Sequence, residues 1–161
     1  MIQANGKNFS RSDLEGKVWI ADFIFTHCAG ICPLMSAKMS SLVQELGALP
    51  GMRFVSFSVD PERDTPEVLA KYAERYKAPA ERWFFLTGDK AQIYRLSSQH
   101  FHLGVAEISP EEREALDQSV RHSAKFVLVD KRGQIRGYYD TDEQNGGAKL
   151  IQDTRLLLAG G

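Results

Sequence analysis

Cysteine, long apolar runs and an excess of charge of one sign are all scarce in this sequence. Its 161 residues contain only two cysteines, far too few for a fold held together by disulfide bonds. No stretch approaches the roughly 20 consecutive apolar residues needed to cross a bilayer, and the first residues lack the basic start and apolar run of a signal peptide. The 20 basic and 21 acidic side chains give a formal net charge of −1, which argues against nucleic acid or a membrane surface as a partner.

What is present is typical of one globular α/β domain. Hydrophobic residues make up 43% of the chain and charged residues 25%, so there are enough apolar side chains to form a core. No internal repeat or low-complexity linker divides the sequence, and 161 residues leave little room for a second domain. We therefore expect residues 1–161 to form a single domain.

The apolar pattern predicts alternating strands and helices over most of the chain. A helix is expected to open at Cys32-Pro33, and Thr65-Pro66 indicates the N-cap and first turn of another. Between 101 and 117 the pattern is weaker, and 109–114 is predicted to be a solvated excursion. The expected strands are 18–25, 53–59, 83–86, 125–130 and 134–139, and the expected helices are 32–46, 66–76, 90–100 and 148–158.

The order β-α-β-α-β-α-β-β-α predicts an α/β fold, a three-layer sandwich with a central mixed sheet. It begins with β-α and ends with β-β-α, which is the thioredoxin order with one βα unit inserted. We therefore expect a thioredoxin-like domain. The loop between the first strong strand and its helix then lies where open α/β sheets place their functional sites.

Cys28 lies in that loop and Cys32 follows it, in the segment Thr26-His27-Cys28-Ala29-Gly30-Ile31-Cys32-Pro33. Cys32 stands at the start of the helix, where free N–H groups and the helix dipole favour a thiolate, so we expect a lowered thiol pKa. Three residues separate the pair, one more than in the Cys-x-x-Cys motif of thiol–disulfide exchange, and the wider loop lets both sulfurs face one ion. Thiolates select Cu(I), zinc or iron–sulfur centres. Incidental buried thiols and metal-free redox exchange are the alternatives.

A stable metal site needs a third ligand, and four histidines are available. The side chain of His27 should point away from that of the neighbouring cysteine. His100 and His102 lie around a predicted helix end, where a histidine is commonplace. His122 stands just before the strand 125–130, on the loop that faces the cysteine turn in a thioredoxin-like fold. A histidine there can reach the sulfurs.

Three longer motifs follow one another along the chain. They are Phe23-Ile24-Phe25-Thr26-His27-Cys28 through Cys32-Pro33, then Val55-Ser56-Phe57-Ser58-Val59-Asp60-Pro61-Glu62-Arg63-Asp64-Thr65-Pro66, then His122-Ser123 ahead of a strand that ends Val129-Asp130. In this order they resemble the Sco/SenC family of copper chaperones, and the similarity covers nearly the whole chain.

The resemblance implies that Cys28, Cys32 and His122 bind one copper ion per chain, as Cu(I) or Cu(II). It implies a role in cytochrome c oxidase assembly, delivering copper to the dinuclear copper site of that enzyme or preparing the site. The implied partners are the copper-accepting subunit of the oxidase, a thioredoxin-like reductant and a copper donor. The implied location is the periplasmic side of a bacterial inner membrane. The resemblance also implies an N-terminal membrane anchor in the full-length protein, and we expect that this anchor and part of the first hairpin are missing from the present sequence.

Two positions need separate treatment. Ala29 stands where the loops of the family often carry proline, which loosens the loop but removes no ligand. Asp60 ends the second predicted strand, and the resemblance implies a contribution near the copper site or the partner surface. The alternative is that Asp60-Pro61 opens a turn and its carboxylate bonds local N–H groups.

Two functions of different class remain open. One is a copper-binding assembly factor without turnover, and the other is an enzyme, a thiol-disulfide reductase acting on the copper-ligand cysteines of the target. The sequence favours the first, because His122 has no role in pure disulfide exchange. A peroxidase of the peroxiredoxin kind needs a proline ahead of its reactive cysteine, and no proline precedes Cys28.

Overall fold

The computed structural model describes residues 1–27, 31–103, 105–107, 120–122, 125–140 and 145–160, with the backbone alone for 31–32, 105–107 and 120–122. One mixed sheet of six strands runs through the described residues in the order β1-β4-β3-β2-β7-β8. The three central strands β2, β3 and β4 are parallel, and β1, β7 and β8 run antiparallel to their neighbours. The bounds are β1 (Ile2–Gln3), β2 (Val18–Ile24), β3 (Met52–Ser58), β4 (Trp83–Thr87), β7 (Lys125–Val129) and β8 (Ile135–Asp140).

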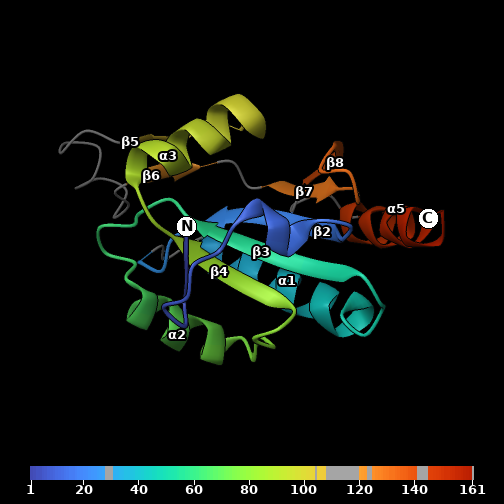
Figure 1. Ribbon diagram of the computed structural model, residues 1–161, viewed down its shortest axis with the longest axis horizontal. Helices are drawn as coiled ribbons and strands as arrows, with labels where there is room; N and C mark the ends of the chain where they lie inside the picture. Colours follow the sequence, from blue (N-terminus) through green and yellow to red (C-terminus); the bar gives the residue numbers. More distant parts are fainter. Residues whose placement is uncertain (28–30, 104, 108–119, 123–124, 141–144, 161) are drawn as a thin grey trace.

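Helices cover both faces of this sheet, which makes three layers (Figure 1). The hydroxyls of Ser36 on α1 and Tyr72 on α2 lie 2.7 Å apart, and α5 packs against both α1 and β2. On the opposite face Phe101, which follows η2, lies edge-on to Trp19 and Phe23 of β2. The helices are η1 (Arg11–Leu14), α1 (Ile31–Leu46), α2 (Pro66–Arg75), α3 (Lys90–Arg95), the π-helical η2 (Leu96–His100) and α5 (Gly146–Ala159).

The apolar core sits on both sides of β2 and β3. Six of the seven residues in each of these strands are buried, as expected for parallel strands covered on both faces. Phe23 and Phe57 stack across the β2–β3 pair with ring centroids 5.0 Å apart. This packing fixes the two strands whose ends carry the loops of interest.

Every strand and helix predicted from the sequence is present, with ends shifted by a few residues. The α2 helix begins as predicted, because the Thr65 side chain accepts a hydrogen bond from Val68 N–H at 3.3 Å and Pro66 is the first helical residue. The predicted helix over 90–100 is α-helical only to Arg95 and continues as a π-helix. Within the described residues, no helix combines the length and apolar character needed to span a membrane.

The expectations missed a short hairpin, the first strand and η1. In the hairpin, β5 (Val105–Glu107) pairs antiparallel with β6 (Val120–His122). His122 was predicted on a loop, whereas its backbone ends β6 and pairs with Val105. Strands of three residues leave too short a pattern to be recognised. The predicted excursion over 109–114 lies outside the described residues.

The β7–β8 turn depends on Asp130. Its Oδ1 accepts hydrogen bonds from the N–H groups of Arg132 and Gln134, each at 2.9 Å, and its Oδ2 accepts one from Arg136 at 3.3 Å. Burial raises the pKa of this carboxyl, but the two N–H groups and the Arg136 guanidinium outweigh burial and hold the pKa below its usual value of 3.8. Gly133, at φ +79°, supplies the left-handed residue of the turn.

Replacing Asp130 with alanine should lower the free energy of unfolding by about 1–3 kcal/mol at pH 7, because three hydrogen bonds to a charged acceptor are lost. A pKa lower in the folded than in the unfolded state stabilises the fold above the unfolded value, and this contribution is lost as the pH falls through the folded value. The difference between wild type and Asp130→Ala should therefore shrink below pH 3.8 in urea unfolding. A difference independent of pH would contradict the role of the charge.

Candidate metal centre

The segments of interest meet at one edge of the sheet. β2 and β3 are parallel and end together, with Ile24 opposite Ser58. β7 runs antiparallel to β2, with Val127 opposite Ala21, so β7 begins beside the end of β2. The chain that follows β2, the chain that follows β3 and the chain that precedes β7 therefore share this edge.

The backbone is described for two of the three predicted ligands, Cys32 and His122. Cys32 is the second residue of α1, near the end where backbone N–H groups lack helical partners and favour a negative ligand. His122 ends β6, three residues before β7, and three residues span at most about 10–11 Å. Its Cα is thus held within that distance of the start of β7.

The ligand set itself stays a prediction. Cys28 lies outside the described residues, as do the side chains of Cys32 and His122. Among the side chains that the structure does describe, no three from His, Cys, Asp and Glu gather closely enough to hold a metal ion.

Asp60 lies where β3 ends and is buried. Its backbone carbonyl accepts hydrogen bonds from the N–H groups of Arg63 and Asp64, at 3.2 and 2.9 Å, and its carboxylate pairs with Arg63 Nε at 2.5 Å. Asp60 thus opens a turn over residues 60–64, and its carboxylate bonds an arginine side chain in that turn. A contribution to a metal site or a partner surface stays a prediction.

Asp64, which sequence reasoning missed, joins this turn to the end of β2. Its carboxylate is fully buried. Oδ2 accepts hydrogen bonds from Thr26 N–H at 3.2 Å and from the Ser58 hydroxyl at 2.6 Å, and Oδ1 accepts one from the Thr26 hydroxyl at 2.5 Å. The one sequence signal for it is its position directly before the N-cap Thr65, as the third carboxylate of segment 60–64.

The other histidines differ in their surroundings. The half-exposed side chain of His27 is turned toward the carboxylate, with Nδ1 3.3 Å from Thr26 Oγ1 and 3.8 Å from Asp64 Oδ1. His100 ends η2, and His102 follows in the left-handed region at φ +55°. Both are at the end of a helical segment, as predicted.

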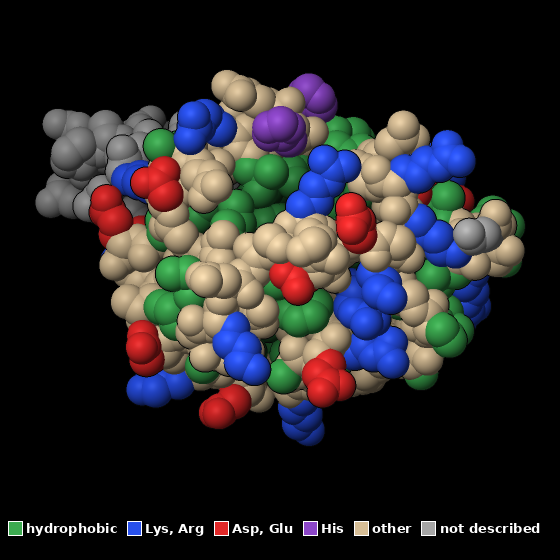
Figure 2. Space-filling model, viewed as in Figure 1, with side chains coloured by type: hydrophobic (Ala, Val, Ile, Leu, Met, Phe, Trp, Pro, Cys, Tyr) green, Lys and Arg blue, Asp and Glu red, His purple; other side chains and the backbone are tan. Residues whose placement is uncertain are grey.

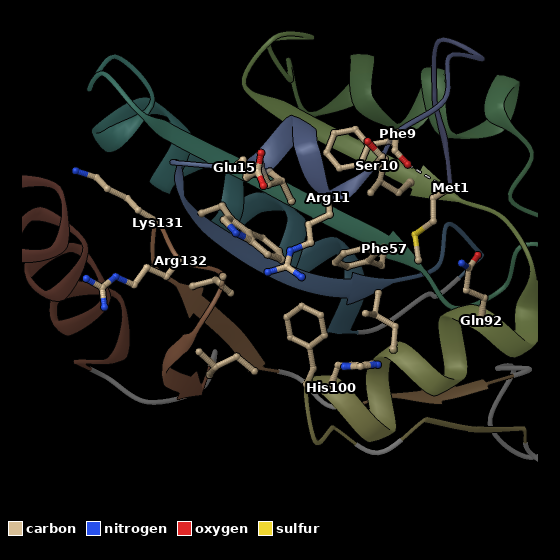
Figure 3. A pocket seen from close by; sticks show the side chains of 18 residues that line it. Met1, Phe9, Ser10, Arg11, Glu15, Phe57, Gln92, His100, Lys131 and Arg132 are labelled. Atoms are coloured by element: carbon tan, nitrogen blue, oxygen red, sulfur yellow. Dashed lines mark hydrogen bonds between the residues drawn. The ribbon is translucent and has the colours of Figure 1, made fainter. Parts of the chain in front are cut away.

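A separate groove of about 840 Å³ lies on the η1 and α3 face of the sheet. Trp19, Phe57 and Phe101 are among its apolar lining residues, and Figure 2 shows the hollow floored by apolar side chains. The Arg11 side chain points into it from η1, whereas Lys131 extends away from it (Figure 3). Among the described side chains, none that lines the groove belongs to segments 26–27 or 60–64.

The chain is similar to known proteins over nearly its whole length. The chain is 32% identical, with a TM-score of 0.84, to a SCO1/SenC family lipoprotein from Bacillus anthracis, over 97% of this chain and 90% of that one. It is 35% identical to BsSco, with a TM-score of 0.81, over 98% of this chain and 89% of that one. BsSco is a member of the Sco family of cytochrome c oxidase assembly proteins, and a disulfide switch was identified in it. It is 25% identical, with a TM-score of 0.74, to yeast Sco1 with copper bound, over 96% and 84%.

These structural neighbours share the thioredoxin-like fold, so the predicted fold class is confirmed. The profile of the SCO1/SenC family matches residues 1–159, nearly the whole chain. The chain belongs to the SCO1/SenC family.

Proposed function

We propose that the chain is a copper-binding assembly factor that holds one copper ion through Cys28, Cys32 and His122. The observation that carries the proposal is the shared edge of the sheet. The loop after β2 holds the first cysteine, the second cysteine is the second residue of α1, and the histidine lies a few residues before β7. We take residues 1–161 as one copper-binding domain.

The chemistry of the donors supports copper in both oxidation states. Two thiolates and a neutral imidazole carry a charge of −2, so Cu(I) leaves −1 and Cu(II) leaves neutrality. The N-terminal end of α1 stabilises the net negative charge of the first state. The nitrogen ligand makes the second state acceptable at a site whose thiolates otherwise favour Cu(I).

The work we propose for this site is to deliver copper to the dinuclear copper site of cytochrome c oxidase, or to prepare that site. Two comparisons support it: yeast Sco1 was solved with copper bound, and BsSco belongs to a family of cytochrome c oxidase assembly proteins. The proposed partners are the copper-accepting subunit of the oxidase, a copper donor and a thioredoxin-like reductant. The lipoprotein relative supports attachment to a membrane, and we propose the periplasmic side.

A thiol-disulfide reductase is the second candidate. The disulfide switch identified in BsSco, which is 35% identical to this chain, favours it. Cys32 at the start of α1 also suits an attacking or leaving thiolate. The two functions differ in what they require of His122, which copper binding needs and disulfide exchange does not.

Reduced protein should bind one copper ion per chain, and protein with an oxidised Cys28–Cys32 pair should bind essentially none. The disulfide removes both thiolate ligands at once. Titration with copper before and after oxidation, followed by removal of loose metal, measures this directly. Equal copper uptake in both states would contradict the proposed ligands.

Replacing His122 with alanine should weaken Cu(II) binding at least about tenfold and affect Cu(I) less, because soft Cu(I) is content with two thiolates. Exchange of the cysteine disulfide with a model thiol should continue at the wild-type rate. The measurement pairs Cu(II) retention against a chelator with disulfide exchange on the same protein. His100→Ala is the matched control, since it removes a histidine from η2.

If exchange collapses in His122→Ala while copper retention is unchanged, the reductase function takes precedence. If both properties survive, His122 is not the third ligand.

A further inference from the structure

The buried carboxylate of Asp64 holds the chain just ahead of the cysteine loop. Thr26 lies two residues after the end of β2 and two residues before Cys28. Both hydrogen-bond donors of Thr26 bond the same carboxylate: its N–H donates to Oδ2 at 3.2 Å and its hydroxyl donates to Oδ1 at 2.5 Å. Two bonds to two oxygens fix the orientation of the peptide group as well as the rotamer of the side chain.

The carboxylate is itself held from the other side. Its Oδ2 also accepts a hydrogen bond from the buried Ser58 hydroxyl at the end of β3, and that hydroxyl accepts one from Asp60 N–H at 3.2 Å. The Asp64 N–H donates to the Asp60 carbonyl at 2.9 Å, and Thr65, the next residue, caps α2. We call the hydrogen bonds of Asp64 with Thr26 and Ser58 the Asp64 clamp. This clamp joins the start of the cysteine loop to β3 and α2.

Burying the Asp64 carboxylate costs free energy. Removing a carboxylate from water is strongly unfavourable unless hydrogen bonds or an opposite charge compensate. In the part of the chain that the structure describes, no Lys or Arg forms an ion pair with Asp64, and the His27 ring lies 3.8 Å from its Oδ1. Two of the three compensating bonds come from Thr26 rather than from the turn itself. The arrangement thus serves the loop that follows β2.

We propose that Asp64 is a positioning residue for the cysteine pair, acting through Thr26. This inference rests on the proposed function, because it assigns Asp64 a role at the same site. By fixing the direction in which the chain leaves β2, the clamp keeps the two thiols in reach of one another and of one ion. Without it the loop samples more conformations, and both the chelate and the disulfide lose stability.

Four variants separate positioning from structural support. Asp64→Ala removes every bond of the carboxylate, and Thr26→Val removes the hydroxyl bond while it keeps the N–H bond. Thr26→Ser keeps a hydroxyl and removes only the methyl group, so it is the conservative counterpart of Thr26→Val. Thr154→Val is the matched control, because Thr154 on α5 is also buried and its hydroxyl donates to the Leu150 carbonyl at 2.7 Å.

The first measurement needs no metal. Each protein is equilibrated with reduced and oxidised dithiothreitol, in which the protein disulfide takes two electrons and two protons from the dithiol and the reagent closes its own disulfide. Asp64→Ala should shift this equilibrium toward the protein dithiol about tenfold, and Thr26→Val by a smaller factor. Thr26→Ser and Thr154→Val should match wild type, although Thr154→Val should lower the melting temperature about as much as Thr26→Val does.

The second measurement is Cu(II) retention against a chelator, with the visible absorption of the Cu(II) protein as its signature. Retention should fall in the same order, and the absorption should change in Asp64→Ala and Thr26→Val but not in Thr154→Val. A clamp that only supports the fold would lower the melting temperature in Thr26→Val and Thr154→Val alike and leave both site readouts unchanged. That outcome would overturn the proposal.

The two claims fail in different ways. If wild type binds no copper but the disulfide equilibrium shifts in the predicted order, the proposed function is wrong and the positioning role stands. If wild type and all variants bind copper and form the disulfide alike, the positioning role is wrong and the proposed function stands. Should Asp64→Ala not fold, the comparison of Thr26→Val with Thr26→Ser decides.

Discussion

The pairing of β2 with both of its neighbours is the constraint on which the rest of this structure depends. β2 pairs with β3 along its whole length, and the two strands are parallel. On its other side β2 pairs with β7, which runs antiparallel to it. The first pairing makes β2 and β3 end together, and the second makes β7 begin at that same end. Three segments far apart in the sequence are thereby brought to one edge. The core on both faces, with Phe23 stacked on Phe57, holds this pairing in place.

Polar groups inside the apolar layers add a second constraint at these strands. The Trp83 indole donates to Ser56, and Ser56 donates to Asp22, which lies in the middle of β2. Asp64 plays the corresponding part at the strand ends. Buried polar groups are tolerated when their hydrogen bonds are made, and bonds that cross between elements fix how those elements sit. The domain thus combines an apolar core with polar links that align β2, β3 and β4.

The fold was predictable from the sequence because its strands and helices are long and strongly patterned. The apolar run of β2 and the Thr65-Pro66 start of α2 are examples, and the order of elements then gave the thioredoxin-like class. The three-residue strands β5 and β6 were not predictable, since so short a pattern carries little signal. Asp64 was missed for a different reason: its partners Thr26 and Ser58 are 38 and 6 residues away, and a carboxylate directly before an N-cap does not indicate contacts at those distances.

The central claim is that copper is held by two sulfurs and the nitrogen of His122, and X-ray absorption at the copper edge tests it most directly. Spectra are recorded on the wild-type protein and on the His122→Ala variant. In both, the cysteines are reduced before loading and the bound metal is Cu(II). The account predicts scattering from two sulfur neighbours and one imidazole in the wild type, with the imidazole contribution absent in the variant. A coordination shell of oxygen and nitrogen without sulfur, or an imidazole signal that persists in His122→Ala, would contradict it.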